Sequence, residues 1–243
     1  MNWNPTWICP ANDLGDPAAV FGTSFVFEKK ITHANLTITA MGVYEARLNG
    51  RRVGQFVMAP GWTSYHKRLQ YQKYDITDLL TNGKNEIEVT VGKGWYRSPL
   101  PGWLGCAYQD ELRSRPCGLA AQITLTFEDG SSKILSTDES WKVSDGPVRF
   151  SEIYDGEIYD SAKTPLLDQP VTIFDGPTDT LILQQGEEVC EQERLAVKKV
   201  FVTPNGETVL DFGQNMTGYV ELFVNAKAGD CVDLSFAEVM DKE

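Results

Sequence analysis

Apolar residues recur at every second position through most of the chain, which is the spacing of strands with one buried face and differs from the helical spacing. The clearest case is the segment 119–127, where every odd position is apolar and the even positions between them are small or polar. The same alternation is found at 36–40, 44–48, 87–91 and 232–236. The pattern predicts an all-β protein.

Short turn sequences separate the predicted strands. Asn49-Gly50, Asp129-Gly130 and Asn205-Gly206 favour the positive φ angles of tight hairpin turns. One segment, 75–80, favours a helix, because an Asp or Thr at its start can cap one or two turns and Asn82-Gly83 ends them. Many short strands joined by hairpins are typical of an antiparallel jelly-roll or β-sandwich domain.

The alternation weakens between positions 163 and 194, where prolines and glycines accumulate. Such a composition is typical of a connection between two β units. The sequence therefore predicts four segments: an N-terminal lead-in at 1–16, a jelly-roll-like domain at 17–165, a connector at 166–198, and the start of a second β-sandwich at 199–243.

Three strands are expected in the last segment, at 208–212, 218–225 and 231–236. Three strands rarely make a complete sandwich. An unpaired edge recruits another chain or frays. We therefore expect this segment to be an incomplete, truncated β-sandwich that dimerises through its edge or is locally disordered.

The net charge of the chain is −12, from 22 basic and 34 acidic residues. This charge repels phosphate groups and anionic lipids, so nucleic-acid and membrane-surface partners are not predicted. No apolar stretch approaches the roughly 18–20 residues of a membrane span, and the N-terminus lacks the regions of a signal peptide. The sequence predicts a soluble protein, most simply a cytoplasmic one.

The residue types of metal and triad chemistry are sparse. The five cysteines include no C-x-x-C pair, which argues against a zinc site and a disulfide framework. His33 and His66 are the two histidines, too few for a multi-histidine metal site and too isolated to indicate a Ser-His-Asp triad.

Several phrases in the sequence are familiar in order and spacing. They are GVYEARLNGRRVG, APGWTSYHKRLQYQKYDITDLL and VGKGWYRS between positions 41 and 98, then YDGEIYDSA at 154–162, LDFGQNMTGYV at 210–220 and a later FAEVM. Together they resemble the N-terminal β region of bacterial α-L-rhamnosidases, glycoside hydrolases of the inverting family 78.

The resemblance implies an accessory role. In that family, β-sandwich domains precede an (α/α) barrel, which carries the general acid and base that an inverting hydrolysis needs. None of the matched phrases belongs to the barrel. The chain is therefore expected to be inactive by itself and to have the C-terminal catalytic barrel of the same parent chain as its partner.

Asp155, Glu157 and Asp160 are the candidate carboxylates. Paired carboxylates can act as acid and base, or can bind calcium together with carbonyl oxygens. The alternative is that they accept hydrogen bonds from loop amides and contact a neighbouring domain. The resemblance favours this alternative, so no catalytic residue is assigned in the chain.

Aromatic residues form the candidate saccharide site, because a flat ring can pack on the apolar face of a sugar. The alternative is packing within the core or against a neighbouring domain. Some relatives bind rhamnose with calcium, but Ser64 stands where the family often has an acidic residue, which removes a ligand oxygen. We therefore predict no cofactor and no metal. The candidate residues are Trp62, Tyr65, Trp95, Tyr96 and Trp103.

Three functions remain open on these grounds. The first is the accessory β segment of an α-L-rhamnosidase, which hydrolyses terminal α-L-rhamnose, with weak binding of a rhamnose-containing saccharide. The second is a stand-alone carbohydrate-binding module. The third is a β-sandwich hydrolase that uses Asp155, Glu157 or Asp160, and it is the least favoured because no other carboxylate motif accompanies them.

Overall fold

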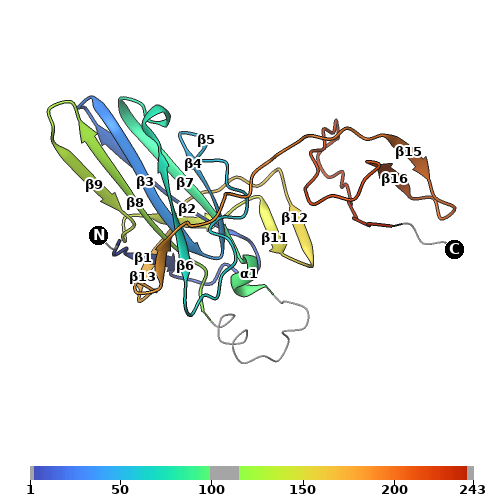
Figure 1. Ribbon diagram of the computed structural model, residues 1–243, viewed down its shortest axis with the longest axis horizontal. Coiled ribbons are helices and arrows are strands. Elements are labelled where there is room, and N and C mark those ends of the chain that lie inside the picture. The colour runs from blue at the N-terminus through green and yellow to red at the C-terminus, as the bar shows by residue number, and fades with distance from the viewer. Residues whose placement is uncertain (1–2, 99–114, 240–243) are drawn as a thin grey trace. The chain divides into compact units, whose positions relative to one another are not determined.

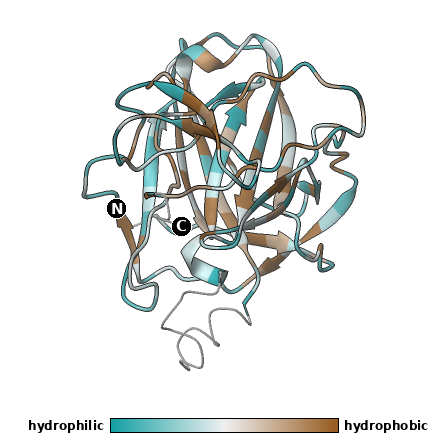
Figure 2. Ribbon diagram, turned by 90° about the vertical axis from the view of Figure 1, so that its right-hand side faces the viewer, coloured by the Kyte–Doolittle hydropathy of each residue, from teal (hydrophilic) through white to brown (hydrophobic). Residues whose placement is uncertain are grey.

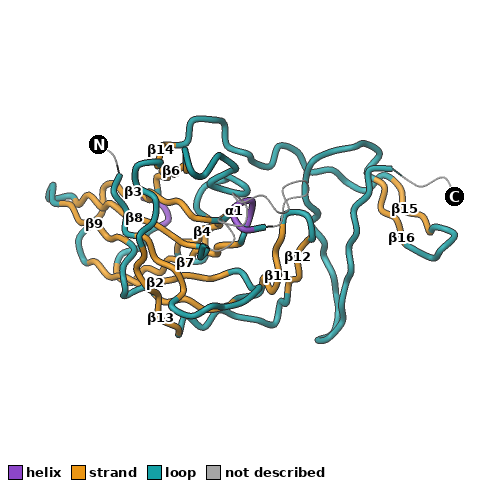
Figure 3. The backbone as a smooth tube through the Cα atoms, turned by 90° about the horizontal axis from the view of Figure 1, so that it is seen from below, coloured by secondary structure: helices purple, strands orange, loops and turns teal. Residues whose placement is uncertain are grey.

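The computed structural model describes residues 3–98 and 115–239. The chain divides into two compact units, Met1–Cys190 and Glu191–Glu243. Each unit is described separately below. Within the described residues, helix is limited to the short turns η1 (Thr77–Leu79) and α1 (Gly94–Arg97), as Figure 3 shows. No described helix is long and apolar enough to cross a membrane.

The first unit is built on a continuous path of paired strands (Figure 1). Their hydrogen-bonded order is β14-β6-β3-β8-β1-β13-β10-β2-β7-β4-β5, and β9 also pairs with β8. β14 runs parallel to β6, and the neighbours of β2, β3 and β8 are antiparallel. The strands are β1 (Trp7–Pro10), β2 (Ala19–Phe27), β3 (Ile31–Met41), β4 (Val43–Leu48), β5 (Arg51–Arg52), β6 (Leu69–Asp75), β7 (Gly83–Gly92), β8 (Gly118–Phe127), β9 (Ser132–Ser136), β10 (Lys142–Asp145), β13 (Gln169–Phe174) and β14 (Leu181–Leu183), with a separate hairpin of β11 (Val148–Glu152) and β12 (Gly156–Tyr159).

The core lies between the two halves of this path. Leu36 of β3 and Leu119 of β8 come from one half, Phe21 of β2 and Val89 of β7 come from the other, and all four are fully buried in one cluster. The path therefore folds over so that the two halves pack face to face, as in a β-sandwich. This confirms the predicted all-β, antiparallel sandwich.

The alternation in the sequence locates the buried faces correctly. In β8 the odd positions from Leu119 to Phe127 are at most 6% exposed, and Ile87 and Val91 of β7 are 0% and 1% exposed. Figure 2 shows hydrophobic and hydrophilic bands along the strands. The turn predictions also hold, since Asn49 and Gly50 have φ angles of 53° and 76° between β4 and β5.

Two predicted boundary segments contribute strands to the sandwich. The expected lead-in at 1–16 contains β1, which pairs with both β13 and β8. The expected connector at 166–198 contains β13 and β14. Trp7 of β1 is 2% exposed, and its indole N–H donates a hydrogen bond to the Pro177 carbonyl oxygen at 2.9 Å. The first compact unit accordingly runs beyond the predicted jelly-roll limits.

The second unit contains one hairpin, β15 (Lys199–Val202) and β16 (Thr208–Asp211), within its described residues. The strands expected at 218–225 and 231–236 are wrong in this structure, because neither segment is extended in a sheet and no described strand pairs with either one. An alternating sequence becomes a strand where another strand pairs with it. Phe223 and Phe236 are 87% and 74% exposed. Dimerisation through this region stays a prediction.

Candidate functional site

Trp62 and Trp95 form a stacked pair on the first unit. Their ring centroids are 6.0 Å apart and their planes differ by 4°. Trp62 is 52% exposed, whereas Trp95 is partly buried and packs against the core. We call Trp62 and Trp95 the indole platform. About half of the Trp62 surface is open to solvent, and a flat aromatic ring can pack on the C–H face of a sugar.

Close backbone packing positions the platform. Gly94, the residue before Trp95, has a φ of 51°, and a Cβ atom there would lie 2.5 Å from a methyl group of Val43. Only glycine fits at this position, so α1 begins directly against β4. On the other side, the Gln70 side-chain amide donates to the Pro60 carbonyl oxygen at 3.2 Å, which holds the chain two residues before Trp62.

Tyr65 and Tyr96 lie beneath the platform and not on its surface. They are 7% and 2% exposed, and their rings meet edge to face with centroids 5.3 Å apart. Burial, opposed by the nearby Arg115, raises the pKa of the Tyr96 phenol well above its usual value. A binding role for both tyrosines stays a prediction, and Trp103 lies outside the described residues.

A cavity of about 160 Å³ lies among these segments. The lining combines apolar and aromatic side chains with the Thr180 hydroxyl, the His66 imidazole and the Arg115 guanidinium. Its volume far exceeds the roughly 10–15 Å³ that one water needs, yet it is smaller than a drug-sized pocket of ~300 Å³ or more. The lining residues are Met41, Tyr65, His66, Leu69, Tyr96, Arg115, Pro177 and Thr180.

The three candidate carboxylates lie on and beside the β11–β12 hairpin. Asp155, Glu157 and Asp160 are all exposed, and Asp160 accepts a hydrogen bond from the Ala162 amide at 3.0 Å. No group of three or more metal-ligating side chains is found in the part of the chain that the structure describes. The Asp160 bond is of the loop-amide kind expected for these residues, and the role of the three carboxylates stays a prediction.

A fourth carboxylate of the hairpin, Glu152, is buried, and sequence reasoning missed it. Its side chain is 6% exposed, and its Oε1 atom accepts a hydrogen bond from the Lys93 ammonium at 2.8 Å. The same ammonium lies 3.0 Å from the Asp16 carboxylate. Burial lowers the pKa of Lys93, but hydrogen bonds and charge from Glu152 and Asp16 outweigh burial and raise it. Because Lys93 directly precedes α1, this ion pair ties the platform to the hairpin. Lys93 and Glu152 are 59 positions apart in the sequence, and no sequence motif indicates that they pair.

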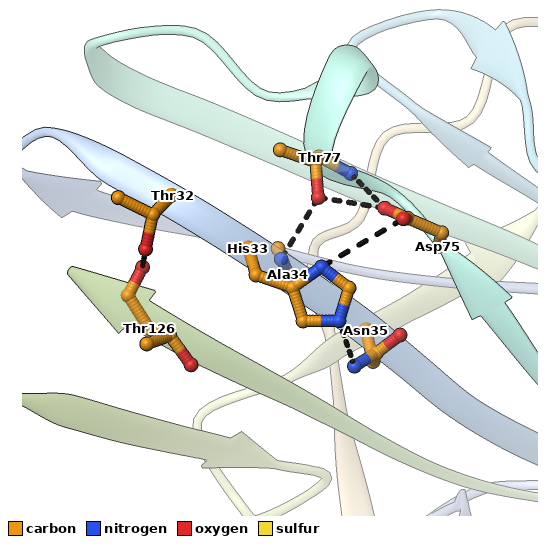
Figure 4. A network of polar contacts seen from close by, with 7 residues as sticks. All are labelled: Thr32, His33, Ala34, Asn35, Asp75, Thr77 and Thr126. Atoms are coloured by element: carbon orange, nitrogen blue, oxygen red, sulfur yellow. Dashed lines mark hydrogen bonds and ion pairs between the residues drawn. The ribbon is translucent and has the colours of Figure 1, made fainter. Parts of the chain in front are cut away.

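His33 belongs to a polar network at the start of η1 (Figure 4). Its Nδ1 lies 3.7 Å from Asp75, and Nε2 contacts the Asn35 amide at 2.8 Å. The Thr77 hydroxyl donates to Asp75 at 2.6 Å and accepts from the Ala34 amide at 2.9 Å. Because Asp75 and the Ala34 amide hold the Thr77 hydroxyl, the network fixes the chain at the start of η1 and does not form a hydrolytic triad.

Asp75→Asn is expected to lower the melting temperature at neutral pH and to have a smaller effect in acid. Hydrogen bonds from the Thr77 hydroxyl and amide, and the charge of His33, lower the pKa of Asp75 despite slight desolvation. Its stabilisation is therefore present above the unfolded pKa of about 3.9 and is lost as the pH falls through the lower folded value.

Thermal melts of both proteins at pH 7 and at decreasing acidic pH measure this difference. Asp78→Asn is the control, because Asp78 is an exposed acid of the same turn whose carboxylate has no hydrogen bond among the described residues. If the difference in melting temperature between wild type and Asp75→Asn stays constant with pH, the Asp75 carboxylate does not stabilise the fold through its lowered pKa.

Two family models match the chain. The model of the alpha-L-rhamnosidase N-terminal domain matches residues 29–193, which is more than half of the chain. The chain belongs to the α-L-rhamnosidase family. The model of the bacterial alpha-L-rhamnosidase concanavalin-like domain matches residues 201–243. The indole platform, the cavity and the hairpin carboxylates therefore all lie within the N-terminal domain match.

Curated relatives support the same family. An alpha-L-rhamnosidase of Streptomyces avermitilis is 36% identical over 226 residues, which cover 88% of this chain and 22% of the relative. One of Formosa agariphila is 32% identical over 231 residues, covering 90% of this chain and 24% of the relative. The chain thus spans about a quarter of the length of the curated relatives it matches.

Solved structures of the family have the same fold. The native α-L-rhamnosidase of Aspergillus terreus has a TM-score of 0.80 and 37% identity, over 88% of this chain and 26% of that one. The Streptomyces avermitilis alpha-L-rhamnosidase, solved in complex with L-rhamnose, has a TM-score of 0.74 and 33% identity, over 82% of this chain and 20% of that one.

Proposed function

We propose that this chain is the accessory β-sandwich part of an α-L-rhamnosidase, that it supports the catalytic barrel of the parent chain, and that it binds rhamnose-containing saccharides weakly through the indole platform. The observation that carries the binding role is the half-exposed Trp62 stacked on Trp95. The family relationship supports the accessory role, and the L-rhamnose complex of a relative makes rhamnose the first ligand to test.

A single platform supports weak binding only. One indole face covers only one side of a sugar ring, so the apolar area buried is small against the cost of immobilising the ligand. L-Rhamnose has an apolar C6 methyl group, and packing this group against an indole adds buried apolar surface. Ser64 offers no carboxylate near the platform, so binding does not require calcium.

The first test is an activity assay. We expect no hydrolysis of an aryl α-L-rhamnoside by this chain, because Asp155, Glu157 and Asp160 are exposed and do not enclose a substrate. Steady-state measurements at high protein concentration are sufficient. Turnover that disappears in Asp155→Asn or Glu157→Gln would place an active site in the hairpin and refute the accessory role.

The second test is a titration with L-rhamnose, followed by tryptophan emission with and without EDTA. We expect a dissociation constant in the millimolar range, which corresponds to about −4 kcal/mol, and no change with EDTA. Trp62→Ala should abolish the signal and the binding measured by calorimetry. Phe223→Ala is the matched control, since it removes an exposed aromatic ring from the other unit. Tight binding lost on chelation, or full binding by Trp62→Ala, would refute the proposal.

A further inference from the structure

The segment that leads from the first unit into the second is docked along β6. It comprises β14 and the residues after it, 181–190, and we call it the strap. β14 pairs in parallel with β6 (Figure 3). Beyond β14, the Gln184 amide donates to the Tyr71 carbonyl oxygen at 2.9 Å, and the Gln184 side-chain oxygen accepts a hydrogen bond from the Gln72 side chain at 2.9 Å. The strap therefore continues along β6 after the paired residues end.

The loop before the indole platform, residues 57–62, has a backbone that needs support from its surroundings. Met58 has a φ of 61° although it is not a glycine, and this conformation costs free energy for a residue with a side chain. It persists only where the surrounding structure holds it. β4 gives one support, because the Tyr44 amide donates to the Ala59 carbonyl oxygen at 2.7 Å. We call these residues the platform loop, since they end at Trp62.

The strap gives the platform loop a second support. The Val57 amide donates to the Val189 carbonyl oxygen at 2.7 Å. The Gln70 side chain bridges the loop and the strap. Its nitrogen donates to the Pro60 carbonyl oxygen at 3.2 Å, and its oxygen accepts a hydrogen bond from the Gln185 amide at 3.4 Å. Release of the strap therefore removes the Val57 bond and one end of the bridge.

The strap is itself held by few buried contacts. β14 has three residues, and residues 185–189 are all exposed. Leu183 and Val189 are 47% and 62% exposed, so docking of the strap buries little of their apolar surface. Segments of this kind open at a lower free energy than the core. The second unit begins at Glu191, directly after the strap, so the strap is also the covalent link to that unit.

From these contacts we infer that the strap regulates the indole platform and that Gln70 is the positioning residue that couples the two. The docked strap keeps the platform loop in the conformation that stacks Trp62 on Trp95, and release of the strap lets the loop relax. A saccharide that prefers the stacked form shifts the population towards the docked strap, and by linkage the docked strap raises the affinity for saccharide. The inference rests on the proposed saccharide binding and adds its regulation.

Two substitutions away from the indole rings test this coupling in the full chain. Gln70→Met keeps the side-chain length and removes both bonds of the bridge. Gln184→Ala removes the bond to Gln72 and leaves the platform loop unchanged. We expect each variant to bind L-rhamnose about threefold or more weakly in calorimetry, because affinity falls with the binding-competent fraction. Gln122→Ala is the matched control and should bind like wild type, since Gln122 is also partly buried but bonds to Thr124 on β8.

Hydrogen exchange gives a readout that a purely structural role of Gln70 would not change. L-Rhamnose at about ten times its dissociation constant should slow exchange of the Val57 and Gln184 amides by up to about tenfold, because the ligand favours the docked form. The slowing should disappear in Trp62→Ala. Amides of the β15–β16 hairpin in the second unit are the control and should exchange at the same rate with and without L-rhamnose.

The possible results separate this inference from the proposed function. Wild-type affinity in both Gln70→Met and Gln184→Ala would overturn regulation by the strap and leave the proposed function standing. Weaker binding by Gln70→Met alone, or exchange of the Val57 amide that does not respond to L-rhamnose, would overturn it as well. Gln184→Ala keeps the test decisive even if Gln70→Met folds poorly. A wild type that does not bind L-rhamnose would refute the proposed function itself.

Discussion

Trp7→Ala is expected to lower the free energy of unfolding of the first unit by about 3–5 kcal/mol, the range for deleting a buried tryptophan side chain. Trp7 is 2% exposed and packs on Phe174 of β13 with ring centroids 6.1 Å apart. The close contact with Gly176, where a Cβ atom would lie 2.4 Å from the indole, leaves little room for the site to collapse after truncation. The substitution also leaves the Pro177 carbonyl oxygen without its indole donor.

Denaturant unfolding of wild type, Trp7→Ala and Trp62→Ala measures the effect with the same chemical change at two sites. Trp62 is half exposed, so its truncation should stay within about 0.5 kcal/mol. If Trp7→Ala unfolds at the same denaturant concentration as Trp62→Ala, residues 1–16 are a peripheral lead-in, as the sequence alone suggested. A loss of several kcal/mol would make β1 an integral strand of the sandwich.

Alternation located β3, β4, β7 and β8 and did not identify β1, β2, β13 or β14. β3, β7 and β8 each have ten or more residues, so the period of two is repeated often enough to identify their buried faces. β1 and β14 have four and three residues, too few for a period to be read. The prolines around β13 also resemble a linker, although Pro170 lies within the strand.

The candidate saccharide site could be predicted from the sequence only in part. Motifs placed Trp62 and Trp95 on loops, where an exposed aromatic residue is informative. They did not show that Tyr96, adjacent to Trp95 in a four-residue helix, turns inward, because neighbouring helical residues face different directions. The Arg115 and Thr180 side chains reach the cavity from segments 50 or more positions from Tyr65. Only the folded chain brings these groups together.

Lys93→Met is expected to destabilise the first unit by about 3 kcal/mol, the low end of the range for removing one partner of a buried ion pair. The substitution leaves the Glu152 carboxylate, 6% exposed, without its 2.8 Å cation, while the second carboxylate of that lysine, Asp16, is 71% exposed. One Glu152 oxygen is already buried without a hydrogen bond among the described residues. The remaining charge is therefore poorly compensated.

A double-mutant cycle separates the lost pair from lost packing. Lys93→Met/Glu152→Met should recover most of the stability, because an apolar pair replaces a charge left alone. Lys142→Met is the control, since Lys142 is exposed on β10 and forms no ion pair among the described residues. Because Lys93 precedes the helix that bears Trp95, the single variant should also weaken saccharide binding. If Lys93→Met is as stable as Lys142→Met, solvent already stabilises the charge of the Glu152 carboxylate. In that case the ion pair does not hold the indole platform in place.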